Sequence, residues 1–357
     1  MRRPLKQPHK NEENLFEELP DDVVVFILTK LSSTASSSSH FLNILSTCKR
    51  FKQLGLHPLV LSKAGSRVLF VHPKKWCDSS HRFLKRCVDA GSVEAFYTLG
   101  MIRFYCLQNR KSGLSLIAKA AMMMHAPALY SLAVIQFNGS GGSKHDKDLR
   151  AGAALSARAS MLGHIDALRE FGHCLQDGYG VKQNVTEGRR LLVQANIREL
   201  LLVLRAIAAD SPSRAGFCQE TLRSLKNMAV PMISNNDENG YNVTVPEVHP
   251  VNWFLRQWFE SGRGILEEGL RLCSHIGCGR VEMRPHEFRR CSVCGTVNYC
   301  SRGCQSLDWK LRHKMECSPL EGGWFEENNG GGGGVGPLVG GGGGGGVNEN
   351  NGNDVAV

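Results

Sequence analysis

The chain has 357 residues, a length at which two or three folded domains are expected rather than one. Lys and Arg number 43 against 33 Asp and Glu, and the formal net charge of +10 is too diffuse to indicate nucleic-acid binding. The best candidate for a membrane span, residues 200–209, is far shorter than the roughly 18 apolar residues required and contains Arg205. No apolar signal segment follows the basic N-terminus, so we expect an intracellular protein of the cytoplasm, the nucleus or both.

Residues 1–14 are polar and basic, and we expect them to form a flexible leader. A short helix is predicted next, because Pro20 can start a helix and Asp21 and Asp22 suit its positive first turn. Its apolar side chains follow at helical spacing: Val24, Ile27, Leu28 and Leu31. A serine-rich loop and a second apolar pattern complete a unit at residues 15–60. A unit this small builds little core, so it needs a partner or the next domain to cover its apolar face.

The centre of the chain, residues 88–205, repeats itself. The similar segments EAFYTLG, PALYSLA and DALREFG end at Gly100, Ala133 and Gly172, which are 33 and 39 residues apart. This period is typical of stacked helical pairs, none of which could bury its apolar face alone. We therefore predict an α-solenoid in this region.

Three further segments follow the repeats. Residues 210–248 contain prolines and an acidic polar run, and we interpret them as a linker. Residues 249–272 are predicted to be a helix, because apolar side chains recur at helical spacing at Val251, Phe254, Leu255 and Trp258. Residues 321–357 are mainly Gly and Asn and should be disordered, because they cannot form a packed core.

Seven of the chain's 13 cysteines fall within one 45-residue window. They are Cys273, Cys278, Cys291, Cys294, Cys300, Cys304 and Cys317. Their odd number, in a chain without a secretory signal, argues against disulfides, so metal binding is the better explanation and a redox role is the alternative. With His313 the window offers eight ligands, enough to close two tetrahedral sites, and closed sites of this kind hold structural zinc.

The order of these ligands resembles the MYND-type zinc finger, on the segments CSHIGCGR, CSVCGTVNYC and SRGCQSLDWKLRHKMEC. The resemblance implies that one zinc is bound by Cys273, Cys278, Cys300 and Cys304. It implies that the other is bound by Cys291, Cys294, His313 and Cys317. The family usually opens with two residues between its first two cysteines, whereas Cys273 and Cys278 are separated by four. His275 is therefore an alternative to Cys273.

MYND fingers resemble one another in that they bind short Pro-rich or apolar peptides in a groove lined by a Gln and a Trp. These two residues match Gln305 and Trp309 in this chain, so the resemblance implies that Gln305 and Trp309 contact a peptide. The alternative is that Trp309 only fills the small core between the zinc ions. The finger region has a local charge of +5. Its basic residues are not interleaved with several aromatic ones, which argues for a solvated basic face and against nucleic-acid binding.

The segment from Leu19 to Leu54 resembles an F-box, with its Leu-Pro opening and the closing CKRF at residues 48–51. The resemblance implies docking onto a Skp-type adaptor, and through it a cullin scaffold, by Leu19, Pro20, Ile27 and Leu28. The alternative is a helical hairpin that caps the repeats. The repeats resemble Sel-type, tetratricopeptide-related repeats, and the combination is similar to plant F-box proteins with a C-terminal MYND finger.

The expected fold is mainly α: F-box helices, a solenoid of Sel-type repeats, a zinc-stabilised finger and a disordered tail. No local pattern supplies a nucleophile with a base, paired carboxylates or an open metal site, so we do not expect this protein to be an enzyme. The predicted function is that of a substrate-recognition adaptor of an SCF-type (cullin-RING) E3 ubiquitin ligase. In it, the repeats and the finger would bind a target protein. The alternative is a MYND-dependent transcriptional cofactor or scaffold. This type of finger also occurs in protein lysine methyltransferases, a third functional class. The chain has no cofactor-binding Gly motif, which argues against that class.

Overall fold

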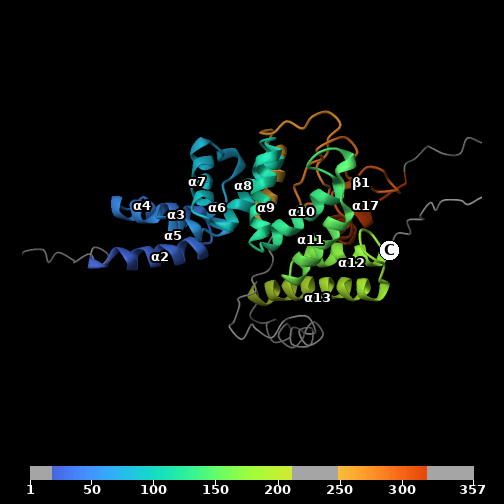
Figure 1. Ribbon diagram of the computed structural model, residues 1–357, viewed down its shortest axis with the longest axis horizontal. Helices are drawn as coiled ribbons and strands as arrows, with labels where there is room; N and C mark the ends of the chain where they lie inside the picture. The colour runs from blue at the N-terminus through green and yellow to red at the C-terminus, as the bar shows by residue number, and fades with distance from the viewer. Residues whose placement is uncertain (1–17, 211–247, 320–357) are drawn as a thin grey trace, which may run out of the picture. The chain divides into compact units, whose positions relative to one another are not determined.

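The computed structural model describes residues 18–210 and 248–319, and within them the fold is mainly α, as predicted (Figure 1). The predicted leader at 1–14, the predicted tail at 321–357 and nearly all of the predicted linker lie outside the described residues. One cluster of buried side chains runs from the N-terminal helices through the first two helical pairs to the cysteine-rich region. These parts therefore share a core.

The N-terminal helices pack against one another and against the first helical pair. They are α2 (Asp21–Thr34), α3 (Ser38–Leu45), α4 (Lys49–Gly55), α5 (Pro58–Ser62) and α6 (Ser66–Leu69). Helix α2 contacts α4 and α5, and the guanidinium of Arg50 on α4 pairs with the Asp21 carboxylate at 2.6 Å. Helices α5 and α6 contact the two helices of the first repeat, which thereby cover part of this unit's apolar surface.

The four residues predicted to contact an adaptor lie in different environments. Leu28 is 2% exposed and packs in the core, because the apolar stripe of α2 faces the protein interior. Ile27 is 41% exposed, Pro20 is exposed and Leu19 is half-buried. Leu28 is thus a core residue in this structure, and only the other three are placed to meet a partner.

The repeats are three helical pairs followed by a long helix. They comprise α7 (Asp78–Asp89) with α8 (Val93–Tyr105), α9 (Arg110–Met122) with α10 (Ala126–Asn138), and α11 (Leu149–Met161) with α12 (Ile165–Asp177), then α13 (Val185–Asp210). Of two short 3-10 turns, η1 (Pro73–Lys75) precedes α7 and η2 (Lys144–Asp146) lies between α10 and α11. The array begins at Asp78 and not near residue 88 as predicted. Its first helix, α7, was not predicted because it is polar and buries only Leu84 and Cys87, so its apolar pattern is too weak to indicate a helix.

Glycines allow neighbouring helices of the array to approach closely. A Cβ at Gly113 on α9 would lie 2.6 Å from the backbone nitrogen of Phe104 and 2.8 Å from the carbonyl oxygen of Gly100, both on α8. The same device recurs between α12 and α13, where a Cβ at Gly188 would lie 2.7 Å from the carbonyl oxygen of Gly172. Side chains at these positions would force the helices apart.

A single helix, α15 (Pro250–Glu260), leads into the cysteine-rich region and packs against α6, α8 and η1. Its buried residues are the predicted stripe of Val251, Phe254, Leu255 and Trp258. The prediction that the helix continues to residue 272 is wrong, because Gly262 adopts a left-handed conformation that ends it.

The cysteine-rich region contains little regular structure. Its elements are the antiparallel strands β1 (Arg289–Arg290) and β2 (Asn298–Tyr299), helix α16 (Arg302–Asp308), the π-helical turn η5 (Trp309–His313) and α17 (Lys314–Glu316). Among the helices of residues 18–210 and 248–319, not one combines the length and apolar character needed to cross a bilayer.

We expect the Gly113→Ala variant to lower the free energy of unfolding by about 1–3 kcal/mol, because the added methyl group meets backbone atoms of α8 that cannot move aside. Chemical denaturation monitored by circular dichroism measures this. Gly141→Ala is the matched control, since its Cβ would meet only the side chains of Leu114 and Ile135, at an ordinary 3.6 and 3.9 Å. Equal midpoints for the two variants would contradict the close approach.

Candidate metal centres

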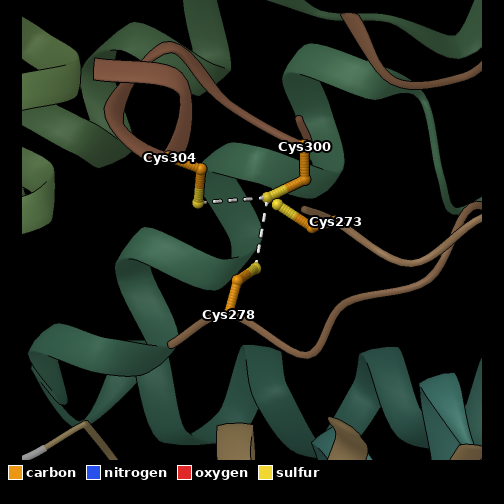
Figure 2. A group of neighbouring side chains, drawn as sticks. All are labelled: Cys273, Cys278, Cys300 and Cys304. Atoms are coloured by element: carbon orange, nitrogen blue, oxygen red, sulfur yellow. Dashed lines mark hydrogen bonds between the residues drawn. The ribbon is translucent and has the colours of Figure 1, made fainter. Parts of the chain in front are cut away.

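Four cysteines converge in a buried space between two loops and a helix (Figure 2). Cys273, Cys278, Cys300 and Cys304 each offer a sulfur, and these sulfurs all lie within 4.8 Å of one another. The Sγ–Sγ distances are 3.4 Å from Cys278 to Cys300 and 3.6 Å from Cys300 to Cys304. All four side chains are buried, so this first group is closed to solvent.

The backbone explains how these cysteines come together. The bridge between Leu272 and Val281 closes the loop that carries Cys273 and Cys278, and Gly279 turns the chain in a left-handed conformation behind the second sulfur. Cys304 lies in the first turn of α16, whose N-cap Ser301 accepts a hydrogen bond from the Cys304 backbone at 3.0 Å.

A second group contains Cys291, Cys294, His313 and Cys317, again with one ligand atom each within 4.8 Å of the others. The Cys294 sulfur lies 3.5 Å from Nε2 of His313. Burial opposes the charged form of Cys294, but hydrogen bonds, first among them one from the Thr296 hydroxyl at 3.1 Å, lower its pKa to about 6. This thiol is therefore prepared to act as a thiolate ligand.

The donor chemistry of both groups fits zinc. Four sulfurs, or three sulfurs and an imidazole nitrogen, are the ligand sets of closed tetrahedral zinc sites. Burial raises the pKa of Cys273 well above its ordinary value, so four thiolates can share this space only around a cation. The two groups have the same members as the two sets that the resemblance implied, and His275 belongs to neither.

The predicted peptide contacts lie on the segment that follows the first group. Gln305 and Trp309 are both half-buried, and the Trp309 ring meets the His313 ring edge-on at 5.8 Å between centroids. Trp309 thus supports a metal-site residue with one part of its surface and remains accessible with another. Leu311 and Met315 on the same segment are 70% and 89% exposed.

Sequence reasoning missed a set of residues around the first group. Arg280 is 3% exposed, and its Nη1 donates to the Cys278 sulfur at 3.4 Å. Asn138, far away in sequence, donates to the Cys300 carbonyl oxygen at 2.8 Å. In the sequence Arg280 is one of nine basic residues between positions 271 and 317, and nothing there indicates that it is buried.

Two family models match the chain. The model described as "Plant tetratrico peptide repeats" matches residues 68–171, which include the first helical pairs. The model described as "MYND finger" matches residues 273–317. The MYND finger is a zinc-binding domain and the two groups could hold two zinc ions, so both the predicted finger and the predicted cofactor are confirmed.

Two curated relatives from Arabidopsis thaliana match most of the chain. "F-box protein At5g50450" is 62% identical over 318 residues, covering 89% of this chain and 89% of the relative. "F-box protein At1g67340" is 60% identical over 323 residues, covering 88% and 83% respectively. Among solved structures, a Sel1 repeat protein from Oxalobacter formigenes covers 67% of this chain and 84% of its own. Its 15% identity and TM-score of 0.35 are too low to carry an argument.

We expect the Cys294→Ser variant to bind about one zinc ion per chain where the natural protein binds about two, because a structural site that loses a thiolate no longer closes. Elemental analysis of the purified full-length protein measures this content. Cys77→Ser is the control, since that thiol is exposed and belongs to neither group. A Cys294→Ser protein that keeps both ions would rule out this residue as a ligand.

Proposed function

The chain belongs to the family of F-box proteins represented by its two Arabidopsis relatives, and from this premise we propose that it is a substrate-recognition adaptor of an SCF-type E3 ubiquitin ligase. In this role it binds a Skp-type adaptor through its N-terminal helices and a target protein through the repeats and the MYND finger. It acts by binding and not by catalysis.

The observation that carries the proposal is a set of exposed apolar side chains on the N-terminal helices. Helix α2 buries Val24 and Leu28 in the chain's own core, yet it leaves Phe26 and Ile27 62% and 41% exposed. Leu42 on α3 and Leu59 on α5 are 47% and 60% exposed. Several large apolar side chains left in water on one small unit favour a surface that another protein covers.

We also propose that the two groups described above are the zinc ligands: Cys273, Cys278, Cys300 and Cys304 for one ion, and Cys291, Cys294, His313 and Cys317 for the other. The ions serve structure and not chemistry, because all four positions of each site are taken by protein atoms. They hold α16 and η5 in place, and with them the half-exposed Gln305 and Trp309 that we propose to contact the target.

We expect the Ile27→Asp variant to bind a purified Skp-type adaptor at least about tenfold more weakly, because a carboxylate would be buried in an apolar interface. Isothermal titration calorimetry with the full chain measures the affinity. The control is Val193→Asp, a change at a 54% exposed apolar position of α13, far from the F-box in sequence. Failure of the unchanged protein to bind any Skp-type adaptor would refute the ligase role and leave a scaffold without one.

We expect the Trp309→Ala variant to retain zinc and adaptor binding but to lose most of its captured target proteins, because the ring offers a large accessible apolar contact beside the finger. Quantitative mass spectrometry of proteins that co-purify with the variant and with the natural chain tests this. Leu311→Ala, at a 70% exposed neighbour on the same segment, is the control. A Trp309→Ala protein that loses zinc and keeps its targets would make the ring a core residue only.

A further inference from the structure

The second helices of the first two repeats, α8 and α10, have no exposed residue and therefore need cover on more than one side. Helix α8 buries nine of its 13 residues and α10 likewise nine of 13. The first helices of the repeats cover one side of them. Part of the other side is covered by the zinc finger, which contacts Tyr130, Ser131, Asn138 and Glu170. Together with Tyr97, whose hydroxyl lies beside that of Ser131, these residues form what we call the docking face.

Polar contacts join the docking face to the loops of the first cysteine group. The Tyr130 hydroxyl lies 3.1 Å from the Ser301 hydroxyl, and the backbone nitrogen of Gly303 donates to the Glu170 carboxylate at 2.7 Å. Asn138 donates to the Cys300 carbonyl oxygen, as described above. All these groups are buried, so separating the finger from the repeats would leave them without partners unless water reached them.

Arg280 lies at the centre of this contact. Its guanidinium donates to the Cys278 sulfur, donates through Nη2 to the Ser131 hydroxyl at 2.9 Å, and lies over the Tyr130 ring at 5.6 Å. A buried cation needs a buried negative charge. A divalent ion held by four thiolates has a net charge of about −2, and the first cysteine group therefore supplies that charge when zinc is bound.

The contact extends through the docking face to the first repeat. The Ser131 hydroxyl lies 3.1 Å from that of Tyr97, and the Tyr97 ring packs against the rings of His125 and His249 at 5.0 and 4.9 Å. Both imidazoles bond the carboxylate of Glu94, at 3.1 and 2.6 Å. His249 immediately precedes α15, the helix that leads into the finger. The finger is thus linked to the repeats by its loops and also through the start of α15.

We propose that zinc in the first cysteine group acts as a lock that holds the finger on the docking face, and that loss of this ion releases the finger and uncovers Tyr97 and Tyr130 as a new aromatic surface. Arg280 is the positioning residue that couples the two. We assign no such role to the second cysteine group, whose Cys291 and Cys294 bond Val297 and Thr296 within the finger itself. The lock rests on the proposed zinc ligands of the first cysteine group and does not depend on the ligase role.

Hydrogen exchange of the full-length, zinc-loaded protein tests the lock, with zinc content measured in parallel. We expect amides of α8 and α10 to exchange on the order of 100-fold faster after chelation of both ions, and also in an Arg280→Met variant that still holds zinc. Arg289→Met, at an exposed arginine of the same finger, and Cys294→Ser should leave the protection of these helices unchanged.

A second variant tests the contact from the repeat side without touching the finger. Tyr130→Phe combined with Ser131→Ala removes the bonds to Ser301 and Arg280, and should speed exchange in α10 by about tenfold while both ions stay bound. Unchanged protection of α8 and α10 after both ions are removed would overturn the lock. Unchanged protection in the Arg280→Met and the double variant would overturn the part assigned to Arg280 and the docking face.

Discussion

The arrangement of this protein depends on the gathering of four sulfur atoms in a space without water. Burial makes a thiolate costly, and four of them can share such a space only around a divalent cation. Because Cys273 and Cys278 come from one loop, Cys300 follows a strand and Cys304 starts a helix, the ion fixes the relative positions of three segments that have almost no apolar core of their own. The fold of the finger and its contact with the repeats both follow from that constraint.

The shared core has a consequence for the adaptor role that we propose. Buried side chains form one cluster from Val24 in the N-terminal helices to Cys304 in the finger. A partner bound to the exposed face of α2 and a target bound beside Trp309 would therefore be held by one continuous body and not by modules on a flexible tether. Such an arrangement would fix the orientation of a bound target relative to the bound partner. Orientation matters here because the reaction on the target would be carried out by another protein, which has to meet the target in the right geometry.

The local features of the fold could be predicted from the sequence and the long-range ones could not. The crowding of cysteines indicated eight candidate ligands, and the resemblance to the MYND finger implied how they divide into two groups. The spacing of Gly100, Ala133 and Gly172 identified the repeats, because that pattern is confined to one period. Helix α7 was not predicted because its sequence is polar. Leu28 was assigned to a partner although it is a core residue, since periodicity shows that a stripe is apolar but not what covers it. Arg280 was missed because its burial depends on residues of α10 that are remote in sequence.

That remoteness has a consequence for how the chain is made. Tyr130 and Ser301 are 171 positions apart. During translation, α8 and α10 leave the ribosome well before the segment that covers them, so their apolar sides stay open until Cys304 has emerged and the first cysteine group has bound its ion. Newly made chains should therefore depend on chaperones and on the cellular supply of zinc, and a transcript that stops short of the finger should yield an aggregation-prone product.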